Sequence, residues 1–363
     1  MTTQDARLTE QVAARVEALL SRYKDPVVAA MRAALDRPGE HLRLMRYHLG
    51  WEDAAGNQTP VDSGKMLRPA LCLLCCEAVG GGAARAMPAA AALELLHNFT
   101  LIHDDIEDAS DTRHRRATLW RVAGVPRAIN AGDGMFVLAQ RTLLGLADTG
   151  LAPPRVLEAA RVLDEACVVL CEGQHADISF ETRTRVTLGE YEAMIGGKTA
   201  ALLGAAAAIG AIAGGADDAT AVALGECGRR LGMAFQIQDD VLGIWGESDV
   251  TGKPVADDIR SRKKSFPVVY AFDHLSADRL AQLERIYAHD RTLEQGAKTG
   301  VVSVDDVDAV LSLLESIGAR AAATAEAERW SRSALAVLAP LKLEPERRSE
   351  LEALASFFVH REK

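Results

Sequence analysis

Apolar residues recur at the spacing of an α-helix along nearly the whole of this 363-residue chain. Two such stripes are Leu8, Val12, Val16, Leu19 and Leu20 near the start, and Val307, Val310, Leu311 and Leu314 near the end. A spacing of three and four residues places such side chains on one face of a helix. No stretch between turn signals shows the alternation of apolar and polar residues that is typical of a strand. The sequence therefore predicts an all-α protein.

Signals for helix ends interrupt this pattern. Thr187–Glu190 and Thr292–Gln295 fit the capping box that starts a helix, and Gly80–Gly82 and Gly318 fit helix ends. The predicted loops are residues 50–64, 109–117, 246–254 and 257–264. No internal repeat or low-complexity linker divides the chain. We therefore expect one domain over residues 1–363, with a motif-bearing core at about 63–267 and C-terminal helices at 303–363.

The composition narrows the class of protein. A chain that is 48% hydrophobic and 25% charged suits a folded protein with a large core, and a net charge of −10 argues against a broad nucleic-acid surface. The N-terminal residues lack the apolar segment of a secretory signal. The uncharged run 199–216 is mostly Ala and Gly, which predicts a buried helix and no membrane span. We expect a cytoplasmic protein.

The six cysteines are Cys72, Cys75, Cys76, Cys167, Cys171 and Cys227. They lie in apolar helical runs without the paired spacing of a zinc site. We expect them to be buried and reduced.

Two clusters of aspartates interrupt apolar runs: Asp104, Asp105 and Asp108 form the first, and Asp239 and Asp240 the second. On a helix Asp104 and Asp108 share one face with Cβ atoms about 6 Å apart. Their carboxylates would repel by about 3 kcal/mol at an effective dielectric constant of about 20. A divalent cation relieves this repulsion, and sparse carboxylates suit Mg²⁺, which retains waters and binds phosphates. One acidic pair could merely complement a helix dipole, but two clusters within apolar runs favour metal binding.

Basic residues accompany both clusters. They are Lys65, Arg68 and His97 before the first, Arg113, His114, Arg115 and Arg116 after it, Lys198 between the two, and Lys253, Arg260, Arg262, Lys263 and Lys264 after the second. Each alone could be a solvated surface charge. Cations and metal-binding carboxylates around one cavity, however, would bind a diphosphate from two sides.

The order of these motifs resembles that of the trans-isoprenyl diphosphate synthases, or polyprenyl synthetases. The matching segments are Leu95–Asp105, Gly173–Asp177, Gly197–Thr199, Phe235–Asp240 and Thr251–Pro254. The resemblance implies a single helical bundle of the isoprenoid synthase type around a deep apolar cavity, assembled as a homodimer. It also implies a Mg²⁺-dependent prenyltransferase that condenses isopentenyl diphosphate with an allylic diphosphate. The product expected is a trans short-chain polyprenyl diphosphate.

The resemblance also assigns roles to matching residues. Asp104 and Asp108 would hold two Mg²⁺ ions and Asp239 a third, with Asp105 and Asp240 in support. The allylic diphosphate would contact Arg113, Lys198, Gln236 and Lys253, and isopentenyl diphosphate would contact Lys65, Arg68 and His97. The backbone carbonyls near Lys198 and Thr199, together with Gln236, would stabilise a carbocation, and the departed diphosphate would accept the final proton. Gln174 and Asp177 would bind metal-coordinated water.

Two positions depart from the family pattern, and at a third the alignment chooses between two neighbouring lysines. Gly243 stands where the second motif usually has a third aspartate, which predicts weaker binding of the third ion. His114 replaces a second arginine expected at isopentenyl diphosphate, unless Arg115 or Arg116 compensates. Lys263, and not Lys264, aligns with the family's substrate-binding lysine.

Product length would depend on what closes the cavity below the first motif. Phe99 lies five residues before Asp104, and its ring could form the floor, although simple core packing is the alternative. An aromatic residue there, followed by the small Thr100, resembles enzymes that make the twenty-carbon geranylgeranyl product, with the fifteen-carbon farnesyl product next.

Two other functions fit the same motifs. A class I terpene cyclase would share the metal clusters but would need no isopentenyl diphosphate site. A non-catalytic subunit of a heteromeric synthase would need a partner for turnover.

Overall fold

The computed structural model describes residues 3–59, 64–246, 256–288 and 302–360, and it is 79% helical with about 2% strand. The prediction of an all-α protein is confirmed. The predicted capping box at Thr292–Gln295 lies outside the described residues, whereas the box at Thr187–Glu190 is formed with both of its hydrogen bonds.

The helices and strands run in the following order. The first part of the chain forms α1 (Thr3–Ala34), α2 (Glu40–His48), α3 (Leu67–Ala78), α4 (Ala83–Glu107), β1 (Thr112–Arg113), β2 (Arg116–Ala117), α5 (Leu119–Ala123), α6 (Val125–Leu144) and the 3₁₀ turn η1 (Gly145–Thr149). The middle forms α7 (Pro153–Glu181), α8 (Leu188–Ile195), the π-helical turn η2 (Gly196–Ala200), α9 (Ala201–Gly214) and α10 (Asp218–Trp245). The last part forms α12 (Asp257–Arg260), α13 (Phe266–His274), α14 (Ala277–Tyr287), α15 (Val304–Ser316), α16 (Ala319–Leu338) and α17 (Pro345–His360).

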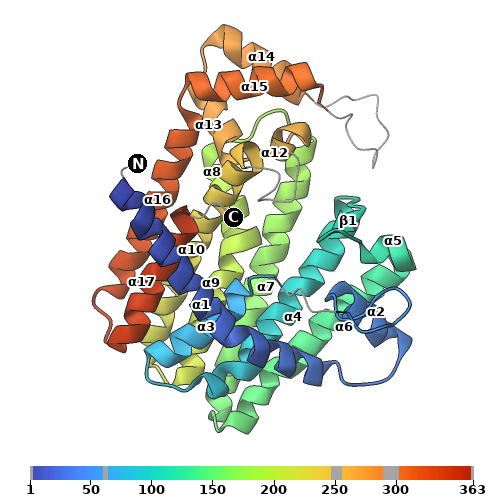
Figure 1. Cartoon of the computed structure of the whole chain (residues 1–363), viewed down its shortest axis with the longest axis vertical. Coiled ribbons are helices and arrows are strands. Elements are labelled where there is room, and N and C mark those ends of the chain that lie inside the picture. Colours follow the sequence, from blue (N-terminus) through green and yellow to red (C-terminus); the bar gives the residue numbers. More distant parts are fainter. Residues whose placement is uncertain (1–2, 60–63, 247–255, 289–301, 361–363) are drawn as a thin grey trace.

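The helix α9 lies at the centre of the bundle, where it packs against α3, α4, α7 and α10 (Figure 1). Its Ala- and Gly-rich sequence lets these neighbours approach closely, and nearly all of its side chains are buried. Within the described part of the chain, residues 188–214 alone are long and apolar enough to cross a membrane. Because 78% of their apolar window is buried inside the protein, the prediction of a buried helix for this run is confirmed.

The C-terminal helices complete the bundle at one side and one end. The helix α16 packs along α10, and α17 packs against α1 and α16. The helices α12 to α15 share a separate apolar cluster with the end of α10, at the top of the molecule in Figure 1. This arrangement places the second aspartate cluster between the main bundle and that end.

Two predicted loops contain regular structure. The segment 109–117 includes a two-residue hairpin in which Arg113 pairs with Arg116, and its turn residues His114 and Arg115 have φ angles of +49° and +61°. Positive φ at both turn residues is the geometry that matches the twist of a tight hairpin. The segment 257–264 begins with the short helix α12. Residues 60–63 and 247–255 lie outside the described part.

Candidate active site

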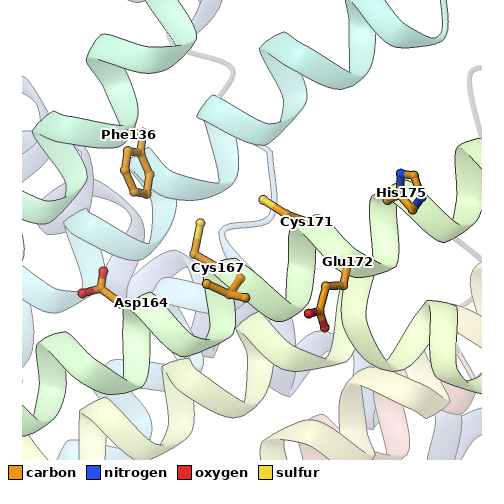
Figure 2. Close-up of a pocket in the computed structure, with 7 residues that line it drawn as sticks. Phe136, Asp164, Cys167, Cys171, Glu172 and His175 are labelled. Carbon is orange, nitrogen blue, oxygen red and sulfur yellow. The ribbon is translucent and has the colours of Figure 1, made fainter.

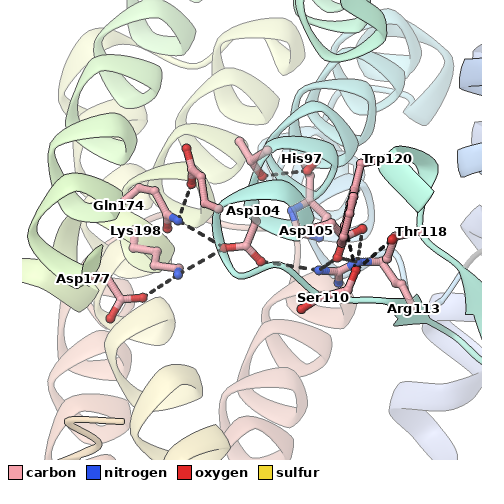
Figure 3. Close-up of polar contacts among 12 residues, drawn as sticks. His97, Asp104, Asp105, Ser110, Arg113, Thr118, Trp120, Gln174, Asp177 and Lys198 are labelled. Atoms are coloured by element: carbon pink, nitrogen blue, oxygen red, sulfur yellow. Dashed lines mark hydrogen bonds and ion pairs between the residues drawn. The ribbon is translucent and has the colours of Figure 1, made fainter. Parts of the chain in front are cut away.

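The first aspartate cluster lies at the C-terminal end of α4 (Figure 3). The Asp104 carboxylate accepts hydrogen bonds from Lys198 Nζ and Gln174 Nε2, both at 3.3 Å, and from Arg113 at 3.4 Å. These donors come from η2, α7 and the hairpin, three segments that are distant in sequence. Asp104 therefore lies at the point where three elements meet.

Asp105, by contrast, is held by one protein cation. It is only 2% exposed, and Arg113 Nε donates to its two oxygens at 2.9 and 3.1 Å. The hairpin that carries Arg113 is anchored to the end of α4 because Thr118 and Trp120 donate to the carbonyl oxygen of Ser110. A carboxylate that is buried and paired in this way can orient Arg113.

Asp108 caps the same helix and is exposed at the surface of the cluster. Desolvation by the surrounding protein and, next, the nearby carboxylates of Asp104, Asp177 and Glu181 together raise its pKa to about 7, although Lys198 acts in the opposite direction. Neighbouring carboxylates raise one another's pKa because their negative charges repel. Such a site favours a bound cation.

The π-helical turn η2 connects the two clusters. Lys198 Nζ donates to Asp177 at 2.6 Å as well as to Asp104 at 3.3 Å, and Thr199 Oγ1 of the next residue donates to Gln236 Oε1 at 2.7 Å. Consecutive residues of one turn thus face opposite acidic clusters. Single π turns within helices are frequent at functional sites.

A glycine on α7 permits this arrangement. A Cβ atom on Gly173 would lie 2.1 Å from the backbone nitrogen of Lys198 and 2.7 Å from the carbonyl carbon of Gly197. No side chain fits between these backbones, so η2 can rest directly on α7. The contact brings Lys198 next to Gln174 and Asp177 of α7.

The second cluster lies on α10, where Asp240 is 1% exposed. Its carboxylate accepts four hydrogen bonds: from the Tyr191 hydroxyl at 2.6 Å, the Phe266 backbone N–H at 2.9 Å, Gln236 Nε2 at 3.1 Å and Lys263 Nζ at 3.2 Å. These donors occupy both of its oxygens. Asp240 therefore organises its neighbours, as the supporting role implied by the resemblance requires.

Asp239 is half-buried on the neighbouring position of α10. Burial lowers the pKa of Arg68, and the charges of Glu94 and Asp239 act in the opposite direction, so Asp239 lies within electrostatic reach of Arg68. The contacts through Lys198, Thr199 and Gln236 form a continuous polar path from Asp104 to Asp240. The two aspartate clusters therefore belong to one site.

Two of the three residues expected at isopentenyl diphosphate, Arg68 and His97, lie within electrostatic reach of each other, and His97 is also within reach of Arg113. Burial lowers the pKa of His97 well below its ordinary value, and the charges of Arg68 and Arg113 and the imidazole of His48 lower it further, so this imidazole is neutral near pH 7. Arg68 Nε is buried without a hydrogen-bond partner in the described structure. Lys65 is exposed, with its ammonium 5.8 Å from the centre of the Phe357 ring.

A small pocket of about 150 Å³ lies between α2 and the hairpin. Its lining includes His48, Asp105, Arg113, His114 and Arg116. Burial and, next, the charges of Arg113 and Arg116 and the imidazole of His114 together lower the pKa of His48 to about 3, against a hydrogen bond with Asn98 that raises it. The guanidinium groups of Arg113 and Arg116 therefore line this pocket beside a neutral His48.

Arg116 faces this pocket, and Arg115 is exposed. In the hairpin Arg113 and Arg116 are direct cross-strand partners, so their side chains share one face. Arg116 stacks on the Tyr47 ring at 4.4 Å from its centre and donates to the Glu52 carbonyl oxygen at 2.8 Å. The register of the turn therefore decides which arginine stands beside Arg113.

His48 was not assigned a role from the sequence, and Arg116 was named there only as one of two residues that could compensate for His114. His48 lies in a helix without a recognisable motif, so no local pattern marked it. The sequence signal for Arg116 was the basic run Arg113–Arg116: if its two middle residues form a hairpin turn, Arg116 pairs with Arg113. Lys253 lies outside the described residues, whereas Lys263 contacts Asp240 and so lies at the site.

An open, mainly apolar groove of about 660 Å³ runs along α7 (Figure 2). Cys167 and Cys171 line it from α7 and Phe136 lines it from α6. The Phe99 ring packs against Phe136 with ring centres 5.4 Å apart. Phe99 is therefore next to the groove through Phe136, a residue that sequence reasoning missed. The groove lining extends along α7 to His175, the residue that follows Gln174.

All six cysteines are free thiols, and five are buried as predicted. The prediction is wrong for Cys171, which is exposed. Cys171 lines the groove together with Val168, and this groove is open to solvent.

The donor set fits a magnesium site of the kind that substrate completes. In the described residues no three His, Cys, Asp or Glu side chains converge closely enough to hold a metal by themselves. Asp104 and Asp108 nevertheless offer carboxylate oxygens on one face of α4, and Lys198 now balances Asp104. Mg²⁺ is commonly bound by one or two carboxylates, with water and phosphate oxygens as the other ligands.

Comparison with known proteins agrees with this geometry. Residues 52–303 match the family model described as polyprenyl synthetase. The chain is 38% identical to the (2E,6E)-farnesyl diphosphate synthase of Mycobacterium tuberculosis, over 98% of this chain and 96% of the relative. It is also 38% identical to the geranylgeranyl diphosphate synthase of that organism, over 95% and 94% of the two chains.

A solved structure is similar over the same extent. The crystal structure of polyprenyl synthetase from Streptomyces coelicolor superimposes with a TM-score of 0.87 at 40% identity, over 95% of this chain and 99% of the other. These similarities span the fold and both aspartate clusters. The chain belongs to the polyprenyl synthetase family and is a prenyltransferase of the trans short-chain prenyl diphosphate synthase type.

Proposed function

We propose that this protein is a Mg²⁺-dependent synthase that condenses isopentenyl diphosphate with an allylic diphosphate to give geranylgeranyl diphosphate, with farnesyl diphosphate as the next candidate. The observation that carries the proposal is the polar path from Asp104 through Lys198, Thr199 and Gln236 to Asp240. It supports one diphosphate between two carboxylate clusters. Relatives with farnesyl and geranylgeranyl names are equally similar, so product length is proposed from Phe99.

In this proposal Asp104, Asp108 and Asp239 hold the Mg²⁺ ions, three in number. When bound, the ions would neutralise negative charge on the leaving diphosphate. Lys198 and Arg113 contact the same diphosphate. To do so, they give up part of their hydrogen bonding to Asp104 and donate to the diphosphate oxygens instead. Preorganised cations stabilise charge that develops as the allylic C–O bond breaks. Lys263 is held by Asp240 at the opposite side of the site, and Lys253 is assigned to the diphosphate by resemblance alone.

The allylic cation needs oxygen dipoles without a nucleophilic side chain. The backbone carbonyls of η2 and the Gln236 side-chain oxygen supply such dipoles, and Thr199 fixes the orientation of Gln236. The double bond of isopentenyl diphosphate attacks the cation, and the departed diphosphate accepts the proton. No protein general base is required.

Isopentenyl diphosphate binds next to the hairpin in this proposal. Lys65, Arg68 and His97 contact its diphosphate, and His114 and Arg116 supply further donors from the small pocket. Neutral His97 can donate one N–H without adding charge. The presence of this cationic pocket favours a synthase over a cyclase, which would not need it.

Product length depends on the groove along α7. We propose that Phe99 and its neighbour Phe136 block the growing chain where α4 and α6 approach. The growing chain extends from the aspartate clusters toward Cys171 and Cys167.

We also propose a homodimer in the cytoplasm. Exposed apolar side chains gather on α5 and α6, where Val122, Val125, Ile129, Val137 and Leu144 are each 38–63% exposed. Exposed apolar residues that gather on one face mark a contact surface. Size-exclusion chromatography with light scattering tests the assembly, and a monomer at micromolar concentration would contradict it.

The decisive test of function is turnover by the purified protein alone. We expect labelled isopentenyl diphosphate to enter a twenty-carbon product with dimethylallyl, geranyl or farnesyl starters, and chelation of Mg²⁺ to stop the reaction. Hydrocarbon release from the allylic substrate alone would instead identify a cyclase. Turnover only after addition of a partner subunit would identify a non-catalytic subunit.

A further inference from the structure

The hairpin β1–β2 is a sheet of two strands, and the two residues of its turn are strained. His114 and Arg115 have φ angles of +49° and +61°, and neither is a glycine. Residues with a side chain rarely adopt this left-handed conformation, and they remain in it only where the surrounding structure holds them. A two-stranded hairpin is also barely stable by itself in water. Contacts with the rest of the protein must therefore hold this hairpin in its register.

The strand β1 is held from α4. Arg113 donates to the two oxygens of Asp105 at 2.9 and 3.1 Å and to Asp104 at 3.4 Å (Figure 3). These contacts need the backbone of β1 to lie within reach of α4, and the register pairs Arg113 with Arg116 of β2. The place of β2 therefore limits where the Arg113 side chain starts.

The strand β2 is held from the other side by Tyr47 of α2. The Tyr47 hydroxyl donates to the Ala117 carbonyl oxygen at 2.7 Å, and the Arg116 guanidinium stacks on the Tyr47 ring at 4.4 Å from its centre. The same guanidinium donates to the Glu52 carbonyl oxygen at 2.8 Å. Tyr47 is only 6% exposed, so its ring is fixed by packing. One buried side chain thus contacts both residues of β2.

We infer that Tyr47 is a positioning residue that holds the strained hairpin in register and so places Arg113 against the first aspartate cluster. Donors that are already in place stabilise charge in a transition state without rearranging as it forms. A hairpin that leaves its register would move Arg113 away from the place where the leaving diphosphate meets it. The inference rests on the proposed role of Arg113 at that diphosphate.

The first test removes the Tyr47 hydroxyl and keeps the ring. We expect Tyr47→Phe to lower kcat/KM for isopentenyl diphosphate about five- to tenfold, which corresponds to one lost hydrogen bond. Tyr23→Phe is the matched control on α1, because it removes a hydroxyl that donates to Glu77 at 2.8 Å from a side chain that is 4% exposed. It should lower Tm by a similar amount and leave activity unchanged. Activity of Tyr47→Phe no lower than that of Tyr23→Phe would overturn the inference.

The second test relieves the strain at the turn. Glycine adopts positive φ without a steric cost, so Arg115→Gly should restore kcat/KM about threefold or more in the Tyr47→Phe background. Arg115→Ala in the same background is the control, because it removes the same side chain and keeps the strain. A merely structural role of Tyr47 in packing α2 would not respond to a change at the turn. Equal activity of the Gly and Ala combinations would overturn the inference.

The third test measures the hairpin itself, by hydrogen exchange and mass spectrometry of peptides that cover residues 109–118. We expect exchange to be about tenfold faster in Tyr47→Phe than in wild type or Tyr23→Phe, and to slow again when Arg115→Gly is added. Exchange at the wild-type rate in Tyr47→Phe would overturn the inference.

Failure of the proposed function gives a different result. Hydrogen exchange needs no turnover, so wild-type protein that makes no prenyl diphosphate would refute the proposed function and leave the exchange comparison valid. Full activity of an Arg113→Met variant would refute the role of Arg113 at the diphosphate, whatever the exchange rates of the hairpin. The two failures are therefore distinguishable.

Discussion

Glu94 offers a test of the electrostatics around Arg68, beside the proposed isopentenyl diphosphate site. It lies on α4, is 7% exposed and accepts a hydrogen bond from Asn98 Nδ2 at 3.2 Å. Burial raises its pKa from 4.5 to about 7, although Arg68 and Asn98 act in the opposite direction. The substitution Glu94→Gln keeps the size of the side chain and removes its titratable carboxyl group.

The sign of the effect follows from the direction of the shift. Because the folded pKa is raised, Glu94 contributes stability that is fully present below about pH 4.5 and is lost as pH rises to about 7. Each pH unit in this window corresponds to about 1.36 kcal/mol. Between pH 5 and pH 8 the wild type should therefore lose about 3 kcal/mol relative to Glu94→Gln.

Thermal unfolding measures this loss. An unfolding entropy of about 2.1 cal/mol/K per residue over 363 residues converts 3 kcal/mol to about 4 °C in Tm. Calorimetric scans of wild type and Glu94→Gln at pH 5, 6, 7 and 8 should show the difference in Tm changing by this amount in favour of the variant at high pH. Glu165→Gln, at an exposed position of α7, is the control. A difference in Tm that stays constant from pH 5 to pH 8 would show that Glu94 does not titrate in this range.

Three further predictions concern the site. Arg116→Ala should raise KM for isopentenyl diphosphate about tenfold, as expected for one charged hydrogen bond worth about 1.5 kcal/mol, and Arg115→Ala should not; equal effects would contradict the hairpin register as the cause. Phe136→Ala should shift the product to longer chains on chromatography, and an unchanged product would exclude Phe136 from the floor of the groove. Gly173→Ala should lower kcat more than tenfold, because its Cβ atom would displace the backbone at Lys198; activity equal to that of Gly189→Ala, whose Cβ atom would meet nothing within 4 Å, would refute this.

The regular features of the protein could be predicted from local patterns. Helical periodicity predicted the bundle, and the Ala- and Gly-rich run predicted the buried α9. Local sequence patterns failed to predict the structure where contacts between residues distant in the sequence determine it. The hairpin at 112–117 depends on a turn in which two residues have positive φ. The residue types at His114 and Arg115 do not predict such a turn. Cys171 is exposed because the groove beside α7 is open, and its own sequence neighbourhood does not reveal that.

The sequence by itself determined that this protein is helical and that it carries two aspartate clusters, since both properties lie in residues close together along the chain. Only the tertiary structure decided which partner each carboxylate has. Asp105 is paired with Arg113, and Asp240 is saturated by four donors. These partners come from different helices, and close packing sets their distances to within an ångström. The physical reason is that hydrogen bonds and Coulomb forces depend on the distance between two groups in space. The number of residues between them in the sequence does not give that distance.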